Sequence, residues 1–543
     1  MYLDNKHQNY LGLLALLVAM LSLSACEKNQ TTGPWQEPQT ISRGGDNSRA
    51  HSAMNNSFDA ISVWQQIEYK QDADTGLDAN IAHANHNHSH YDVSSRVKIM
   101  ASLGRKSATE DFANHIVWDS PTTLATGEWT SIATIGETGS GVTETRENKT
   151  PGFVSQPQTA INNTGNGIAV WEAKDSVGVS KAYFSLFDNS TNTWSTPAEL
   201  DSSHTGASSQ PQVVSNSDGS FISVWQRHSE SLPFQSTIYA SEYNGSSWTT
   251  ASLLSDDGVS NPVNAHSASL AASATLGIVV AVWVQDNPLG GAGTDHKSNI
   301  YAQRYFPSSA WDTNATLIST NSNNLSQPKV SLNATGNGLV SWLLWELQDN
   351  GDSTFSPLPS KIQARTINNS GSDWADTSGI TTISSDASEY CLYARPSIDD
   401  NGDAWVVWQQ GNSDTILANQ WNNVSSSQIW GANLLSGTWQ SASQVSANSR
   451  FPAQAPELAI DSNGLHVITW QQWQDPRSST GFEIAAKTIA SDGSSGSIVS
   501  VSRTSGNSQR LSMSKNLNNQ IIVTWDVDNN RIQTSQLDSS AAN

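Results

Sequence analysis

Short apolar segments separated by polar turns recur along the chain from about residue 50 to the C-terminus. The pattern is clearest at 209–254. There, segments 211–215, 221–225 and 238–243, and a fourth from Trp248, have the β-branched and aromatic content of strands. Asp, Asn and Gly between them favour tight turns. No 3.6-residue periodicity runs through these segments, so the pattern predicts a four-stranded antiparallel unit and not a helix.

One tryptophan in the second strand marks each copy of this unit. It recurs as Trp64, Trp171, Trp225, Trp283, Trp342, Trp408, Trp470 and Trp525. A four-stranded unit cannot bury both faces alone, and repeats of about 40–60 residues are typical of propeller blades. We therefore predict an all-β chain that forms a single β-propeller of eight blades, with seven or nine as alternatives. The tryptophans are predicted to pack between blades, and ligand stacking is the alternative.

The last copy lacks a fourth strand, whereas the strand-like segment 35–41 belongs to no copy. We expect segment 35–41 to complete the last blade and close the ring, so that residues 35–540 form one domain. The first copy is longer than the others, because Trp64 is far from its expected fourth-strand partner, Trp129. We expect an insertion at about 87–126, and a ninth blade around Trp118 is the alternative.

The first residues predict a targeting signal that is not part of the folded domain. Residues 11–23 are apolar but too few to span a bilayer, and they lead into Leu23-Ser24-Ala25-Cys26. This motif resembles the lipobox of bacterial lipoproteins. The resemblance implies a signal peptide at 1–25, lipidation of Cys26 including palmitate, and a polar tether at 26–34. It also implies attachment to the bacterial outer membrane, on its periplasmic or its cell-surface face.

The net charge of the chain limits the classes of ligand that we expect it to bind. The chain has a formal net charge of −22, which argues against nucleic acid as a ligand. The expected partners are the membrane, through the lipid anchor, and a glycan or protein ligand, and we expect a monomer. Only two cysteines occur, and with Cys26 lipidated, Cys391 is expected to be a small buried hydrophobe.

Loop lengths point to one face of the predicted propeller. The connections after second strands are long and varied, which is typical of a ligand-binding face. They carry acidic and aromatic residues that suit carbohydrate or peptide binding, although relaxed surface loops would look the same. The candidates for ligand contact are Tyr69, Asp72, Asp74, Asp286, Asp349, Asp352, Phe355, Trp473 and Asp475.

Two patterns could hold a metal ion. His86, His88 and His90 alternate, so an extended chain would place their imidazoles on one face, where they could bind Zn²⁺. A solvated polar loop is the alternative. The acidic turn 399–403 offers oxygen ligands for Ca²⁺, but hairpin chemistry explains it without a metal. We therefore expect no cofactor, with Ca²⁺ or Zn²⁺ as alternatives.

No catalytic motif with a known spacing is found, and no catalytic residue is assigned. The blade pattern resembles the repeats of bacterial sialidase-type propellers. The turn 243–248 lies where that family keeps its Asp-box, but it lacks the Ser and Asp of that motif. The resemblance implies the fold and does not extend to the arginine-led sialidase motif, which is absent.

We interpret the chain as a membrane-anchored, non-catalytic propeller that recognises a glycan or a protein. A periplasmic assembly or scaffold lipoprotein is one alternative, and a glycan-active hydrolase or lyase is the other. A cluster of carboxylates with an Arg in the central channel would favour the enzyme. An aromatic-lined shallow face would favour binding.

Overall fold

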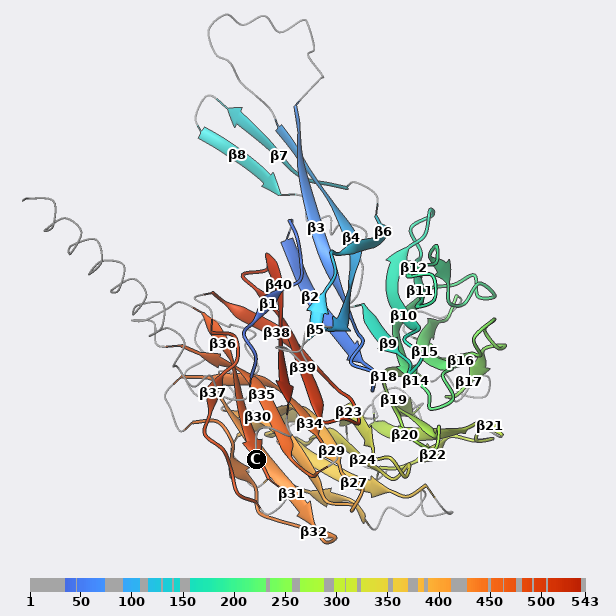
Figure 1. The fold of residues 1–543 in the computed structure, drawn as a ribbon, viewed down its shortest axis with the longest axis vertical. Helices are drawn as coiled ribbons and strands as arrows, with labels where there is room; N and C mark the ends of the chain where they lie inside the picture. The colour runs from blue at the N-terminus through green and yellow to red at the C-terminus, as the bar shows by residue number, and fades with distance from the viewer. Residues whose placement is uncertain are drawn as a thin grey trace, which may run out of the picture.

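The computed structural model describes residues 35–538 except 45, 74–90, 108–115, 128–129, 139–140, 147–156, 231–234, 256–263, 288–296, 308, 320–323, 350–354, 370–378, 385–388, 412–426, 448–450, 462, 475–480, 491–492 and 504–505. For strand residues 70–73, 91–94, 130–138, 141–146, 287, 297, 347–349, 355–357 and 538, only the backbone is described. The described chain is all-β and propeller-like (Figure 1). A search of these residues for a helix long and apolar enough to cross a membrane finds none.

The strands form successive antiparallel meanders, which we call units 1 to 8 in chain order. Unit 1 consists of β2 (Asp46–Met54), β3 (Ala60–Ala73), β4 (Tyr91–Lys106), β5 (Ile116–Trp118) and β6 (Thr122–Thr126), and unit 2 of β9 (Gln158–Ile161), β10 (Gly167–Lys174), β11 (Ser180–Asp188), β12 (Thr193–Trp194) and β13 (Ala198–Glu199). Unit 3 consists of β14 (Ser208–Ser215), β15 (Phe221–His228), β16 (Ser236–Tyr243) and β17 (Ser252–Leu253). Unit 4 consists of β18 (Asn264–Ala272), β19 (Val279–Asn287), β20 (Lys297–Phe306), β21 (Ala310–Trp311) and β22 (Thr316–Leu317). Units 3 and 4 share one parallel bridge, between Ser236 and Asn264.

Units 5 to 8 repeat the same order. Unit 5 consists of β23 (Asn324–Leu332), β24 (Gly338–Trp345), β27 (Lys361–Ile367) and β28 (Thr381–Thr382), and unit 6 of β29 (Tyr390–Ile398), β30 (Ala404–Gly411), β31 (Gln428–Leu435), β32 (Thr438–Trp439) and β33 (Ser443–Gln444). Unit 7 consists of β34 (Ala453–Ile460), β35 (His466–Trp473), β36 (Phe482–Ile489) and β37 (Val499–Ser500). Unit 8 consists of β38 (Ser508–Lys515), β39 (Gln520–Val527) and β40 (Arg531–Asp538), together with β1 (Gln39–Thr40).

The two ends of the described chain meet in unit 8. β1 pairs antiparallel with β40, with Gln39 opposite Thr534, and an isolated bridge joins Trp35 to Leu537. Figure 1 shows β1 beside β40, next to β2 and β38. The first strand of each unit contacts the first strand of the next, from β2 through β9, β14, β18, β23, β29 and β34 to β38, and β38 contacts β2.

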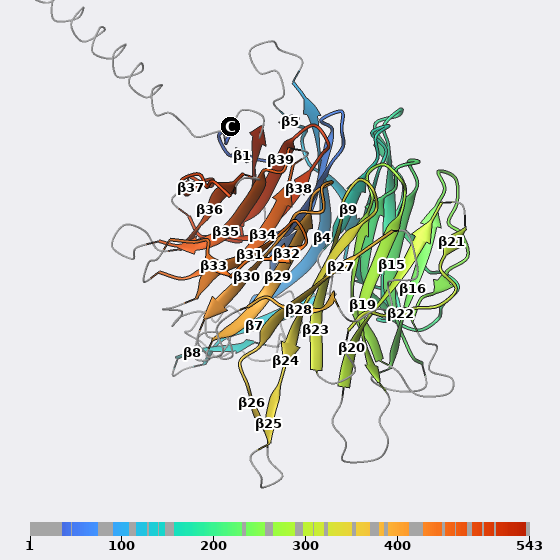
Figure 2. The same ribbon diagram turned by 90° about the horizontal axis from the view of Figure 1, so that it is seen from below.

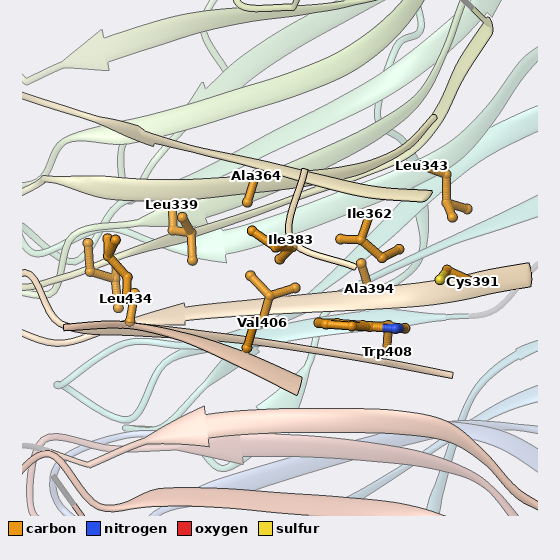
Figure 3. Packing of buried hydrophobic residues seen from close by; sticks show 13 residues of the cluster. Leu339, Leu343, Ile362, Ala364, Ile383, Cys391, Ala394, Val406, Trp408 and Leu434 are labelled. Atoms are coloured by element: carbon orange, nitrogen blue, oxygen red, sulfur yellow. The ribbon is translucent and has the colours of Figure 1, made fainter. Parts of the chain in front are cut away.

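The second-strand tryptophans are buried between units, as predicted. All eight have at most 1% of their surface exposed. Figure 3 shows one such cluster, in which Trp408 and Val406 of β30 face Leu339 and Leu343 of β24. Cys391 lies in the same cluster and is fully buried, which confirms its interpretation as a small hydrophobe. Burying an aromatic side chain of about 150–250 Å² contributes about 4–6 kcal/mol, so these residues account for much of the cohesion between units.

The first unit differs from the expectation in one respect. Trp118 in β5 pairs with Gly104 of β4, as Trp194 pairs with Phe187 in unit 2, so Trp118 holds the fourth-strand position. Segment 87–126 therefore contains the third and fourth strands themselves and is not an insertion. Trp129 lies outside the described residues. The expected insertion included the apolar run at 97–101, which the structure places in the third strand itself, because β4 runs from Tyr91 to Lys106.

Two hairpins extend from the units. β7 (Thr130–Thr138) and β8 (Gly141–Arg146) form the first, and β7 pairs with the start of β4 (Figure 1). β25 (Leu347–Asp349) and β26 (Phe355–Pro357) form the second, which projects from the body in Figure 2. Both hairpins lie at the end of the molecule where the second strands of the units end.

Candidate functional site

A β-bulge interrupts the first strand of seven units at the same place. In each, the pairing register slips by one residue, so that two residues of the first strand oppose the second-strand Trp. The first bulged residue has a positive φ, at Arg49, Gln210, Ser267, Gln327, Tyr393, Ala455 and Arg510. The left-handed conformation costs a non-Gly residue about 1–3 kcal/mol, and bulges re-aim the side chains that they carry. The equivalent residue of unit 2 lies outside the described part of the chain.

The bulges of units 1, 3, 6, 7 and 8 line a cavity of about 880 Å³ where first strands converge. Its volume falls in the range of small-molecule sites. The bulged residues and those just after them form its wall, together with one second-strand residue, Gln471: Arg49, Ala50, His51, Pro157, Gln158, Gln210, Pro211, Gln212, Lys329, Tyr393, Arg395, Ala455, Glu457, Gln471, Arg510, Leu511, Ser512 and Met513. We call this cavity the axial pocket.

Units 1 and 8 each place a guanidinium group in the axial pocket, near enough for the two charges to affect each other. Arg510 Nη1 donates to Asp526 Oδ2 at 2.8 Å. Arg49 makes no hydrogen bond or ion pair with any residue that the structure describes. Burial, and then the nearby Arg510, lower the pKa of Arg49. Burial also raises the pKa of Asp526 to about 7, against the opposing effect of Arg510. We call Arg49, Arg510 and Asp526 cluster A; with Asp526 ionised, its net charge is +1.

Units 5, 6 and 7 build a second group of the same composition. Arg395 Nε donates to Glu457 Oε1 at 2.9 Å. Lys329 has no hydrogen bond or ion pair with a described residue. Burial, and then the charge of Arg395, lower the pKa of Lys329 to about 8, while Glu457 opposes this. We call Lys329, Arg395 and Glu457 cluster B. It again holds two cations and one carboxylate, and Tyr393 lines the pocket beside it.

The wall between the clusters is polar and uncharged. Gln158, Gln210 and Gln212 lie on it, and Gln212 Nε2 donates to the carbonyl of Ala268 at 2.6 Å. Burial lowers the pKa of His51 to about 4, so His51 is neutral at physiological pH. Carboxamides both donate and accept hydrogen bonds, which suits a ligand rich in hydroxyl groups.

The opposite mouth of the axis is built from the turns between first and second strands. It encloses about 260 Å³. Asn55, Asn162, Asn333 and Asn516 hold equivalent turn positions there, and each Nδ2 donates to a backbone carbonyl of the next unit. The last of these bonds, from Asn516 to the carbonyl of Asn55 at 3.0 Å, joins unit 8 to unit 1.

The acidic turn 399–403 belongs to this mouth. Asp399 Oδ1 accepts from the backbone N–H groups of Asn401 and Asp403, at 2.9 and 2.8 Å. Its carboxylate therefore acts as a turn cap, as hairpin chemistry predicts. A search of the described residues finds no group of three or more His, Cys, Asp or Glu able to hold a metal ion. His86, His88 and His90 lie outside those residues, so the Zn²⁺ prediction stays untested.

The candidates chosen from loop lengths are not gathered into one site. Tyr69 is 52% exposed on β3, and Trp473 packs edge-on against Phe482 with ring centroids 4.8 Å apart. Asp286 accepts from Ser298 Oγ and Asn264 Nδ2, at 2.6 and 3.0 Å. None of these three lines the axial pocket. Of Asp72, Asp349 and Phe355 only the backbone is described, and Asp74, Asp352, Asp475 and Cys26 lie outside the described residues.

Sequence reasoning missed the residues of the axial pocket, although a signal for them exists. Ser-Gln-Pro recurs at 155–157, 209–211 and 326–328, and Gln-Ala-Pro occurs at 454–456. Proline lacks an N–H group and fits the unpaired position of a bulge. These tripeptides mark the position of the bulge in the first strands of units 3, 5 and 7 and the equivalent position in unit 2. Two of the charged pocket residues, Arg49 and Arg510, are bulged residues in units that lack the tripeptide. Lys329 and Arg395 lie two residues after a bulged residue, so no single sequence motif contains all four.

Comparison with known proteins gives a fold likeness alone. No protein-family model and no curated protein matches the chain. Among solved structures, an ulvan lyase of a polysaccharide lyase family is 10% identical, with a TM-score of 0.42 over 69% of this chain and 90% of that chain. A Hadza microbial sialidase is 11% identical, with a TM-score of 0.37 over 93% and 95%. An α-L-arabinanase of Penicillium chrysogenum is 11% identical, with a TM-score of 0.35 over 61% and 93%.

Proposed function

We propose that units 1 to 8 are the blades of one closed eight-bladed β-propeller. The pairing of β1 with β40, the contact of β38 with β2 and the Asn516 bond to Asn55 support closure. Closing the ring removes the edges that an open array would expose. In this arrangement the axial pocket and the ring of turn asparagines are the two mouths of one central channel.

We propose that the axial pocket binds an acidic glycan. The observation that carries this is the gathering of four cationic side chains, Arg49, Lys329, Arg395 and Arg510, in one pocket of a chain whose net charge is −22. Like charges brought together with too few carboxylates destabilise the free protein, so an anionic ligand is the natural complement. Guanidinium groups bind carboxylate and sulfate oxygens through paired, charge-assisted hydrogen bonds.

The rest of the wall favours a glycan over an acidic peptide. Carboxamide side chains from several units can meet sugar hydroxyl groups, whose donors and acceptors they match. A peptide would be recognised most simply by pairing with a strand edge. The first strands are bulged where they line the pocket, and a bulge interrupts the hydrogen-bonding row that an added strand needs.

An array of glycans tests this proposal with the soluble protein from Glu27. The array should include uronate-bearing, sulfated and neutral oligosaccharides, with acidic peptides in parallel. We expect binding to acidic glycans that weakens as salt is raised, because exposed charges are screened. Equal binding of neutral glycans, binding of acidic peptides alone, or no binding at all would refute an acidic-glycan site.

A glycan-cleaving enzyme is the second candidate. Glu457 and Tyr393 line the same pocket as the arginines, so a carboxylate and a phenol face a bound sugar. Paired carboxyl groups and phenolic side chains are the usual acids, bases and nucleophiles of glycan cleavage. Chromatography of each bound glycan after incubation separates the two functions, because a binding protein returns the glycan intact.

The lipid anchor remains part of the proposal. Acylation of Cys26 would hold the propeller at a bacterial outer membrane through the tether at 26–34. Each buried CH₂ of the acyl chains would contribute about 0.8 kcal/mol. A glycan ligand fits either the cell-surface or the periplasmic face, and protease accessibility on whole cells distinguishes them.

A further inference from the structure

The axial pocket has two cationic clusters of the same make-up, and they lie on different strands. Cluster A stands on β2, β38 and β39, and the cations of cluster B stand on β23 and β29. Among the first strands, β34 lies between β29 and β38 on one side, and β9, β14 and β18 lie between β2 and β23 on the other. The uncharged glutamines of units 2 and 3 occupy the longer arc.

Each cluster keeps one cation that the protein does not neutralise. In cluster A, Arg510 forms an ion pair with Asp526, whereas Arg49 makes no hydrogen bond or ion pair with a described residue and only feels the charge of Asp526 from farther away. In cluster B, Arg395 forms an ion pair with Glu457, whereas Lys329 makes no hydrogen bond or ion pair with a described residue and only feels the charge of Glu457 from farther away. Two neighbouring cations that share one carboxylate leave a net charge of +1 and are complementary to one anion.

The backbone holds these groups in place before any ligand arrives. Arg49 and Arg510 are themselves bulged residues, with φ of 58° and 49°. Lys329 and Arg395 each follow a bulge by two residues, after Gln327 and Tyr393, with φ of 52° and 57°. The same bulge recurs at uncharged residues such as Ser267 and Ala455, so it belongs to the repeated strand geometry; at these four positions it fixes where the charged side chains leave the backbone.

We propose that the axial pocket has two separate anion subsites, Arg49 with Arg510 and Lys329 with Arg395, and that its ligand is an oligosaccharide with acidic groups on two different sugar residues. This rests on the proposed glycan-binding function and makes it more specific. A glycan with a single terminal acid fills one subsite and leaves the other cation unpaired. A chain of repeating acidic sugars fills both, and the second contact then forms without a further loss of translational freedom.

Calorimetric titrations with defined tetragalacturonates test the two subsites. The probes are the fully acidic tetramer, the tetramer methyl-esterified at all but one carboxylate, and the fully esterified neutral tetramer. Two subsites predict that the acidic tetramer binds at least about tenfold more tightly than the singly acidic one. Equal affinity of these two probes would overturn the second subsite while leaving acidic-glycan binding intact. Failure of both to bind, with sulfated glycans also inactive, would overturn the proposed function itself.

Substitutions of the unpaired cations locate the subsites. Arg49→Gln and Lys329→Gln break no ion pair within the described protein, so their folding should match that of the wild type. Each should weaken the acidic tetramer by about 10- to 100-fold and remove most of its advantage over the singly acidic tetramer. Lys361→Gln is the matched control, because it deletes one positive charge outside the pocket, where Lys361 pairs with Glu346 at 2.7 Å. Loss of affinity in only one of the two pocket variants would indicate a single subsite.

Discussion

Replacement of Trp35 by Ala tests whether the N-terminal segment completes unit 8. Trp35 is only 2% exposed and packs in the cluster that contains Trp525 and Leu537. A buried tryptophan removes about 150–250 Å² from water, which corresponds to about 4–6 kcal/mol. Truncation to Ala should therefore lower the free energy of unfolding by about 3–5 kcal/mol. Urea denaturation of the soluble form, followed by tryptophan fluorescence and circular dichroism, measures this change.

The fourth-strand residue Trp194 provides the matched control. It occupies the equivalent place in unit 2 but is only partly buried, so Trp194→Ala should cost less than Trp35→Ala. Removing segment 35–41 altogether should cost more than either, because β40 then loses β1 and keeps only β39 as a backbone partner. A Trp35→Ala variant as stable as the wild type would refute the closure of unit 8 by this segment.

Three further predictions concern the turn ring, the pocket and the anchor. Asn55→Ala removes the bond from Nδ2 to the carbonyl of Asn162 and the cap on two turn N–H groups, and should lower stability by about 1–3 kcal/mol in urea denaturation. Asp526 has a folded pKa of about 7, above its usual 3.8, so its contribution to stability is full below pH 3.8 and is lost as pH rises through about 7. Asp526→Asn should therefore lose less stability than the wild type between about pH 5 and 8, and should bind acidic glycans more tightly at pH 8, because cluster A keeps its positive charge. Cys26→Ser should abolish labelling by radioactive palmitate and release the protein from the membrane fraction; continued labelling would contradict lipidation at Cys26.

Much of the fold could be predicted from the repeat. Tryptophan at the end of an apolar second strand recurs in every unit, and burial between units follows from its size. The first unit was harder, because the apolar alternation of β4 before Val97 rests on Tyr91 and Val93 alone and is interrupted at Ser95. These residues form a strand because they pair with the long β3, and a short stretch of local sequence does not reveal that pairing.

The candidate site could not be predicted in the same way. Loop length favoured residues such as Asp286 and Trp473, which the structure uses in local hydrogen bonds and ring packing. The pocket instead draws one to four residues from each of several units that are far apart in sequence. Arg49 and Arg510 are separated by almost the whole chain, and the contacts of β2 with β38 and β39 bring them together.

A crystal structure of the soluble protein with tetragalacturonate would show directly where the acidic glycan binds. We expect the sugar to lie in the axial pocket, with one carboxylate about 2.7–2.9 Å from a guanidinium nitrogen of Arg49 or Arg510 and another carboxylate at the same distance from a side-chain nitrogen of Lys329 or Arg395. A tetramer bound instead at the outer loops near Trp473, or in the mouth lined by the turn asparagines, would contradict it.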